Sequence, residues 1–257
     1  MAGIDTYRPI WDFKNCVIIV AHPGDETLWA GGTMLLHPDS NWTVVTVCGA
    51  KDQDKALKFA KAMEAFGAKG EIGPVEESND MSPLNEREIQ NTIAPLLPME
   101  KFDLVITHSI WGEYTRNLRH EEIGKAVLTL RDVGRLPAME IRSFAYEDGG
   151  GKYPPRHSRD ADIITNLTED IWQKKYEILT KIYGFAPESF EAKTAPRKEA
   201  FWSFRLQRQV QKAPAKKEET KLFKRPSLLE EKLRTVAPPV KRPSLLEEKL
   251  QRDKKKS

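Results

Sequence analysis

Short apolar runs and amphipathic stretches alternate through the first two hundred residues of the chain. Strand-length apolar runs lie at residues 16–21 (CVIIVA), 43–48 (TVVTVC), 104–107 (LVIT) and 141–146 (IRSFAY). Apolar residues recur at the three- and four-residue spacing of a helix over residues 54–66, 121–130 and 171–183. Strands rich in Val and Ile that alternate with helices are typical of βαβ units, whose sheet is buried on both faces. The pattern predicts an α/β, Rossmann-like three-layer fold with a mostly parallel sheet.

The composition changes after residue 205. Residues 206–257 hold 16 Lys and Arg against 7 Asp and Glu, a balance of +9, whereas the preceding residues hold 25 against 31, a balance of −6. Glycine is absent from this last segment, and Lys, Glu and Pro dominate it, a composition that cannot build a packed core. We expect a folded domain over residues 1–205 and a mostly disordered basic tail over residues 206–257.

The predicted tail contains the sequence KRPSLLEEKL twice, at residues 224–233 and 241–250. Each copy has the Ser-x-x-Glu spacing of a helix capping box and a stripe of three leucines. Two equivalent segments can occupy two grooves of a protein partner with a gain in avidity, and the basic charge attracts polyanions. A solvated tail without a partner is an equal alternative.

The cysteines and the lengths of the apolar runs indicate which cellular compartment to expect. Cys16 and Cys48 each lie inside an apolar run, so we expect free, buried thiols rather than a disulfide framework. No apolar run approaches the ~20 residues that cross a bilayer, and the sequence begins without a basic region followed by an apolar one. We therefore expect a soluble, cytoplasmic protein without an integral membrane segment.

The sequence HPGDE at residues 22–26 follows the first apolar run directly. In open α/β sheets ligands bind at the carboxyl ends of the strands. An imidazole and a carboxylate three residues apart, His22 and Asp25, can converge there on one divalent metal, and the Pro-Gly pair between them allows a sharp turn. The best candidate for a third ligand is His120, which opens a helix beyond the third strand. Two histidines and a carboxylate with an open fourth position are typical of a hydrolytic zinc site.

Other interpretations of these histidines compete with a metal site. Taken alone, a His-x-x-Asp triplet at a strand end is more often a hydrogen-bonded turn. We interpret His37, His108 and His157 individually as structural or surface residues, although His108 ends a strand at the predicted ligand-binding edge.

Two motifs carry a resemblance to a known family. The sequence VAHPGDETL at residues 20–28, followed by GGT at 31–33, closely resembles the signature of the LmbE-like or PIG-L superfamily of zinc-dependent de-N-acetylases, whose members usually read AHPDDE. The resemblance extends to GEY at residues 112–114 and to a following His-x-x-His element, here NLRH at 117–120. The stretch AYEDGGG at 145–151 is also similar to one found in a bacterial branch. The resemblance covers the first two hundred residues.

This resemblance implies removal of an acetyl group from an N-acetylated amino sugar or glycoconjugate, such as one containing N-acetylglucosamine. It places the Zn²⁺ ligands on His22, Asp25 and His120. Two positions depart from the family: Gly24 stands where the general-base Asp is expected, and Asn117 replaces the first His of the His-x-x-His element. Asn can still donate a hydrogen bond to an oxyanion but cannot titrate near neutrality.

The missing base leaves the proton-transfer group open. Glu26 is our first substitute, with orientation of a metal ligand as its alternative role. The other candidates on predicted loops are Asp52, Glu113, Glu121 and Asp148. If the missing base limits the rate, the substitution Gly24→Asp is expected to raise activity.

Candidate substrate contacts share the loop that precedes the last of the three proposed ligands. Trp111, Tyr114 and Arg116 offer aromatic faces and a guanidinium, which suit the apolar face and the hydroxyl or phosphate groups of a sugar ligand. Each of them can equally close the loop against the core. The two departures and the repeats also support a second hypothesis, a catalytically degenerate sugar-binding or scaffold protein whose tail recruits a partner. A third is a nucleic-acid-associated enzyme steered by the tail.

Overall fold

The computed structural model describes residues 11–76, 82–98, 101–115 and 117–205. The predicted basic tail with its two repeats lies outside the described residues. The strands are β1 (Asn15–Val20), β2 (Asn41–Cys48), β3 (Lys69–Val75), β4 (Phe102–Thr107), β5 (Ala138–Phe144), β6 (Tyr146–Glu147), β7 (Arg156–His157), β8 (Ile163–Asn166) and β9 (Lys198–Arg205). The helices are α1 (Asp25–Leu36), α2 (Gln53–Phe66), α3 (Glu86–Leu96), α4 (Leu118–Asp132), α5 (Glu169–Glu177), α6 (Phe190–Thr194) and the π-helix η1 (Ile178–Ile182).

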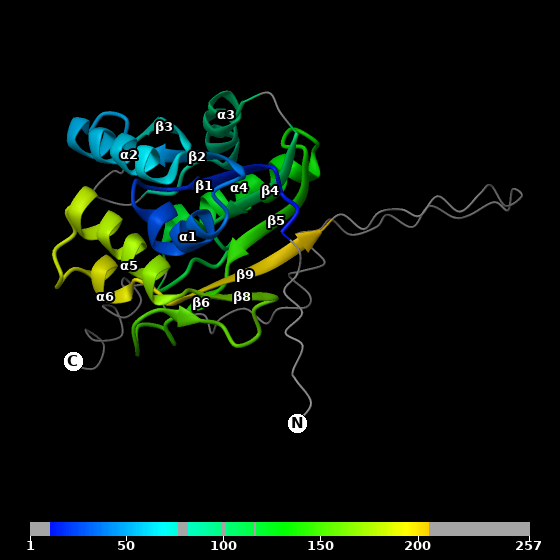
Figure 1. Ribbon diagram of the computed structural model, residues 1–257. Coiled ribbons are helices and arrows are strands. Elements are labelled where there is room, and N and C mark those ends of the chain that lie inside the picture. Colours follow the sequence, from blue (N-terminus) through cyan, green and yellow to red (C-terminus); the bar gives the residue numbers. More distant parts are fainter. Residues whose placement is uncertain (1–10, 77–81, 99–100, 116, 206–257) are drawn as a thin grey trace, which may run out of the picture.

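One mixed sheet forms the centre of the fold, with strand order β3-β2-β1-β4-β5-β9-β8 (Figure 1). The pairs β1/β2, β2/β3, β1/β4 and β4/β5 are parallel, whereas β9 runs antiparallel to β5 and β8. The chain builds outward from β1 through β2 to β3 and then returns to the other side of β1 to add β4 and β5. The position between β1 and β4 is therefore a topological switch point, where neighbouring loops diverge and leave room for a ligand.

Strand β1 shows why the sheet is covered on both faces. Its residues Cys16, Ile18 and Val20 pack into a core with α1, α2 and η1. The alternate residues Val17 and Ile19 pack into a second core with α3 and α4. Because successive side chains of a strand point to opposite faces, a continuous apolar run requires a helical layer on each side. The predicted three-layer α/β fold with a mostly parallel sheet is confirmed.

Several predicted elements keep their type and change their bounds. The helix expected over residues 54–66 is α2, which ends at Gly67 in a left-handed conformation (φ 65°). The helix expected over 171–183 divides into α5 and the π-helix η1. The strand expected over 141–146 ends at Phe144, because Tyr146 pairs with His157 in a separate two-stranded sheet. Cys16 and Cys48 are free and buried, as expected.

Helix α1 was not predicted because it contains Gly31 and Gly32 and buries most of its circumference, so it lacks an amphipathic period. A Cβ on Gly32 would lie 2.5 Å from both methyl carbons of Leu167. The glycine thus allows α1 to approach the segment between β8 and α5, at a cost in helix propensity. Among the helices of the described residues, none combines the length and apolar character needed to cross a bilayer.

Candidate metal centre

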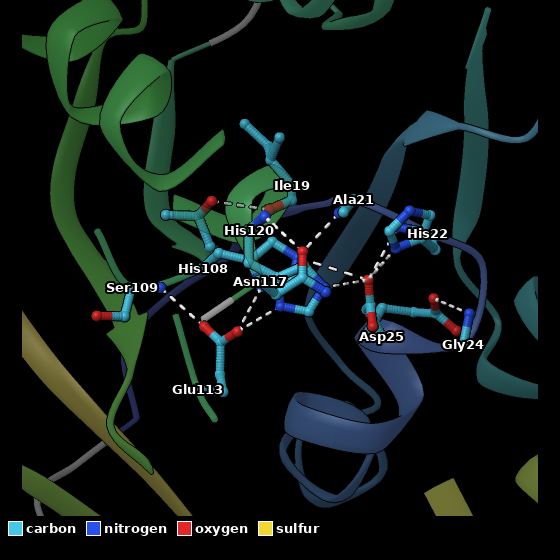
Figure 2. Close-up of polar contacts among 12 residues, drawn as sticks. Ile19, Ala21, His22, Gly24, Asp25, His108, Ser109, Glu113, Asn117 and His120 are labelled. Atoms are coloured by element: carbon cyan, nitrogen blue, oxygen red, sulfur yellow. Dashed lines mark hydrogen bonds and ion pairs between the residues drawn. The ribbon is translucent and has the colours of Figure 1, made fainter. Parts of the chain in front are cut away.

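Three segments meet at the switch point and supply a compact group of imidazoles and carboxylates. His22 comes from the turn after β1 and Asp25 is the first residue of α1, while His108 and Glu113 come from the loop after β4 and His120 from the first turn of α4. Figure 2 shows the Asp25 carboxylate between the imidazole of His22 and the pair formed by His108 and His120. The sequence-predicted trio is therefore brought together by the fold.

The turn after β1 holds its two polar side chains face to face. The amide N of Asp25 donates to the carbonyl oxygen of His22 (3.1 Å), and the amide N of His22 donates to Oδ2 of Asp25 (2.9 Å). Gly24 lies between them as the N-cap of α1 with φ 107° and ψ −31°, a conformation that a residue with a side chain rarely adopts. The same Oδ2 lies 3.2 Å from Nδ1 of His22 and 3.4 Å from Nε2 of His120.

Helix α4 begins where Asn117 caps it. The side-chain oxygen of Asn117 accepts a hydrogen bond from the amide N of His120 (3.3 Å), which satisfies one of the free N–H groups of the first turn. This cap places His120 in the first turn with its side chain only 1% exposed. The residue that departs from the family pattern therefore positions one of the proposed ligands.

Glu113 orients two imidazoles at once. Its Oε2 lies 2.6 Å from Nδ1 of His120 and 3.1 Å from Nδ1 of His108, and its Oε1 accepts from the amide N of Ser109 (2.8 Å). Nε2 of His108 accepts a hydrogen bond from the amide N of Ala21 (2.9 Å), so this network assigns the proton of His108 to Nδ1. Contact with the same carboxylate oxygen likewise assigns a proton to Nδ1 of His120 and directs its Nε2 toward Asp25.

The donor atoms of His22, Asp25 and His120 fit a divalent cation. They lie within 4.8 Å of one another, and buried Nε2 of His120 has no hydrogen-bond partner among the residues that the structure describes. A carboxylate on the far nitrogen of a histidine is the usual support of a zinc-binding imidazole. The atoms of His108, Glu113 and His120 form a second such group, but their mutual contacts and the amide of Ala21 account for the second group without an ion.

The charges of this centre set one another's protonation. Burial opposes the charged form of Glu113, but the imidazoles of His108 and His120 outweigh it and lower the carboxyl pKa to about 2. Burial also opposes a charged His120, yet Asp25 and Glu113 raise its pKa to about 9. Burial by itself would raise the pKa of Asp25. The surrounding imidazoles, of which His120 has the largest effect, outweigh burial and hold this pKa well below its usual range. A cation that binds here must therefore displace a proton from His120 at neutral pH.

Glu26 supports the turn instead of facing the centre. Its Oε2 accepts from the amide N of Gly24 (2.9 Å), and its Oε1 accepts from the hydroxyls of Thr27 (2.6 Å) and Tyr183 (2.7 Å). The side chain is fully buried, and burial raises the pKa of its carboxyl. This geometry favours the alternative that we gave for Glu26, the orientation of a proposed metal ligand, here through the turn that joins His22 to Asp25.

The other substitute bases also have partners. Asp52 caps α2 by accepting from backbone N–H groups of its first turn, and Glu113 holds the two imidazoles described above. Asp148 accepts from the amide and hydroxyl of Thr115. Glu121 lies in the first turn of α4, where a negative charge is favourable. The carboxylates of Asp52, Glu113 and Asp148 are thus committed to the architecture of the loops.

Two of the three predicted substrate contacts can be placed. The hydroxyl of Tyr114 accepts a hydrogen bond from Nδ2 of Asn117 (3.2 Å), and burial, followed by the charge of Asp25, raises its pKa above the usual range. Trp111 is partly buried, and its amide N donates to the hydroxyl of Ser109 (3.2 Å). Arg116 lies outside the described residues.

Sequence reasoning left His108 and Glu113 without a shared role. The signal for His108 was its place at a strand end, and Glu113 was marked only as a candidate base. Their partnership with His120 depends on the path of the loop between β4 and α4, which residue spacing does not determine.

Comparisons with known proteins identify solved structures that share the fold of this chain. N,N'-diacetylchitobiose deacetylase from Pyrococcus horikoshii is 17% identical, with a TM-score of 0.57 over 78% of this chain and 87% of that one. The zinc-inhibited form of teicoplanin deacetylase Orf2 is 13% identical, with a TM-score of 0.56 over 76% of this chain and 100% of that one. These similarities confirm, at the level of the fold, the resemblance to LmbE-like deacetylases.

The same fold also carries other chemistry. GalB, the 4-carboxy-2-hydroxymuconate hydratase from Pseudomonas putida, is 15% identical with a TM-score of 0.53 over 79% of this chain and 100% of that one. By sequence, the chain is 24% identical over 125 residues to an uncharacterized protein of Acanthamoeba polyphaga mimivirus, a match that spans 42% of this chain and 54% of that protein. No family model matches the sequence.

Proposed function

We propose that this chain, which has the fold of the LmbE-like deacetylases, is a zinc-dependent hydrolase that removes the acetyl group of an N-acetylated amino sugar or glycoconjugate. The observation that carries this proposal is the convergence of donor atoms from His22, Asp25 and His120 within 4.8 Å of one another, with the buried Nε2 of His120 facing Oδ2 of Asp25 at 3.4 Å. Bound there, Zn²⁺ supplies a Lewis acid and activates water at neutral pH.

The side chains have distinct tasks in this proposal. His22, Asp25 and His120 would hold the ion. Glu113 fixes the tautomer and direction of His120 through Nδ1. The side-chain amide of Asn117 donates one N–H to Tyr114, and a primary amide carries a second N–H, which suits an oxyanion that develops on the substrate.

The substrate class rests on the two deacetylases with the same fold. One acts on N,N'-diacetylchitobiose and the other on teicoplanin, which supports an acetylated amino sugar as the substrate here. The hydratase shows that the fold alone does not select a reaction. Metal binding by these side chains therefore has to be measured separately from acetate release.

A second candidate function is a sugar-binding protein without turnover. Two observations favour it: Gly24 has a backbone conformation unsuited to the expected Asp, and Glu26, Glu113 and Asp148 are hydrogen-bonded elsewhere. Such a protein would bind zinc and sugar and release no acetate.

The test uses the full chain, stripped with a chelator and titrated to one equivalent of zinc, because zinc inhibits a deacetylase of this fold. We expect near-stoichiometric zinc and acetate release from N,N'-diacetylchitobiose or N-acetylglucosamine, and loss of both in His120→Ala. His37→Ala is the matched control, since His37 caps the opposite end of α1. A protein that binds no zinc would overturn the metal site. A zinc-loaded protein that binds these sugars in a calorimeter and releases no acetate would favour the second function.

A further inference from the structure

The segment 184–190, with sequence GFAPESF, contacts the surroundings of the candidate metal centre at two points, Gly24 and Tyr114. It begins two residues after the end of η1 with Gly184, which has φ 77°, and the amide N of Phe185 donates to the carbonyl oxygen of Leu179 (3.1 Å). At its other end Ser189 caps α6 by accepting from the amide N of Ala192 (3.2 Å). Both ends are therefore anchored, and the phenylalanines at positions 185 and 190 have fixed places.

Phe185 covers the turn that carries two of the proposed ligands. Its Cε2 and Cζ lie 3.1 and 3.2 Å from the point where a Cβ on Gly24 would be. Its ring also stacks on Tyr183, with ring centroids 5.9 Å apart. Phe185 thus occupies the space beside Gly24. Gly24 belongs to the turn that joins His22 to Asp25.

Phe190 reaches the centre through a different residue, Tyr114. Its ring centroid is 4.8 Å from that of Tyr114, and the Tyr114 ring is 5.7 Å from the imidazole of His120. A line of rings therefore leads from a proposed ligand to the surface, where Phe190 is 42% exposed. Among the described residues, five large hydrophobic side chains are exposed, and Phe190 is the aromatic one. The others are Leu57, Val133, Met139 and Ile164.

The single charged side chain of this segment, Glu188, is exposed and paired. Glu188 pairs with Nζ of Lys193 at 2.8 Å, and its side chain is 85% exposed. The surface that the segment offers beside the ligands therefore comes from Phe185 and Phe190.

We infer that Phe185 and Phe190 form an aromatic rim of the candidate metal centre that selects substrates with an apolar group directly beside the scissile amide. The inference rests on the proposed deacetylation and names its substrate class. Aromatic faces bind apolar surface at a small cost in conformational entropy, and a few polar groups then fix the orientation of the ligand. The apolar group is either an aglycone or neighbouring ring on the sugar side, or an acyl chain longer than acetyl.

Two substrate series distinguish these sources. The first holds the acetyl group constant and compares free N-acetylglucosamine with its p-nitrophenyl β-glycoside. The second holds free glucosamine constant and compares its N-acetyl, N-butyryl and N-octanoyl derivatives. We expect kcat/KM to rise with apolar size in one series, and Phe190→Ala to reduce that preference roughly five- to tenfold.

Matched variants keep the test independent of folding. Phe190→Trp should retain the preference, and Ile164→Ala, which removes a side chain of similar exposure (39%) on β8, should leave it unchanged. Zinc content and the urea midpoint of each variant identify any loss of structure. An equal preference in wild type and Phe190→Ala would overturn the inference while deacetylation stands.

Direct binding separates the two proposals if no substrate turns over. The p-nitrophenyl glycoside and N-octanoylglucosamine are then titrated into the zinc-loaded protein in a calorimeter. Binding that weakens in Phe190→Ala and persists in Phe190→Trp would support the aromatic rim while the proposed reaction fails. Absence of binding, or equal binding to wild type and Phe190→Ala, would overturn the rim.

Discussion

Oε2 of Glu113 and Nδ1 of His120 lie 2.6 Å apart, both in buried side chains. This contact leaves the other nitrogen of His120 to face Asp25 at 3.4 Å. Two acceptors would repel each other at that distance, so either a proton or a cation must lie between them. The carboxylates of Glu113 and Asp25 therefore favour a positive charge at the His120 imidazole, either as a bound proton or as a cation.

Replacing Glu113 by Gln should weaken zinc binding without removing a ligand. Gln keeps the shape of the side chain and loses the charge that supports the His120 imidazole, so we expect zinc affinity to fall about 10- to 100-fold. Competition with a fluorescent chelator measures the change. Glu147→Gln is the control, because Glu147 is half exposed and pairs with Arg156 away from the donors. Equal zinc affinity in wild type and Glu113→Gln would show that the carboxylate does not orient His120.

Zinc affinity should increase with pH. The pKa of His120 in the metal-free protein is raised from 6.5 to about 9, so zinc displaces one proton at pH values below it. Apparent affinity should rise roughly tenfold per pH unit between pH 6.5 and 8.5, because one proton is released per ion. Isothermal titration in buffers of different ionisation enthalpy counts that proton. Release of no proton at pH 7 would contradict the charged state of His120.

The same pKa predicts how pH changes the stability of the metal-free protein. A pKa that is higher in the folded state than in the unfolded state means that folding takes up a proton, and the resulting stabilisation is complete below pH 6.5. It is lost as the pH rises through about 9. Urea midpoints of chelator-treated protein should therefore fall from pH 6.5 to 9.5, and the corresponding slope should be smaller in His120→Asn. Identical slopes would assign the pH dependence to other groups.

Gly24→Asp should destabilise the protein rather than restore a base. The left-handed backbone at φ 107° and the Phe185 ring 3.1 Å from the new Cβ both oppose a side chain, at a cost of about 1–3 kcal/mol for the backbone alone. Our sequence-based expectation, that Gly24→Asp raises activity if the missing base limits the rate, did not include this cost in stability. Urea unfolding and acetate release measure the two effects.

A control for this substitution is Gly67→Asp. Gly67 also has a positive φ of 65°, but no atom lies within 4 Å of its Cβ position. It should lose less stability and keep zinc. Higher acetate release by Gly24→Asp at unchanged stability would reinstate the missing-base explanation.

The ion pair between Lys175 and Glu199 should contribute strongly to the free energy of unfolding. Nζ and Oε1 are 2.7 Å apart with both side chains fully buried, and Glu199 also accepts from the amides of Gly32 and Thr33. Lys175→Met leaves a buried carboxylate without its cation, so we expect a loss of about 3–5 kcal/mol in unfolding free energy. Lys181→Met, which removes an exposed lysine paired with Glu177, should leave the urea midpoint unchanged. Similar midpoints for the two variants would contradict the importance of the buried pair.

Local patterns were sufficient for much of the fold. The runs at residues 16–21 and 43–48 predicted two central strands because their Val and Ile content requires burial on both faces, and the period of residues 54–66 predicted α2. Helix α1 was missed because burial around its circumference removes the amphipathic period. Strand β3 (KGEIGPV) contains two glycines and a proline, so its assignment depends on pairing with β2 rather than on propensity.

The sequence by itself determined the layers of the sheet and placed His22 and Asp25 on one turn, because strand burial and a three-residue spacing are local properties of the chain. Only the tertiary structure decided which loops meet, since strand order depends on packing between segments far apart in sequence. That order places β4 beside β1 and so brings His108, Glu113 and His120 to the turn. It also placed Phe185 against Gly24, a contact across about 160 residues that no local pattern encodes.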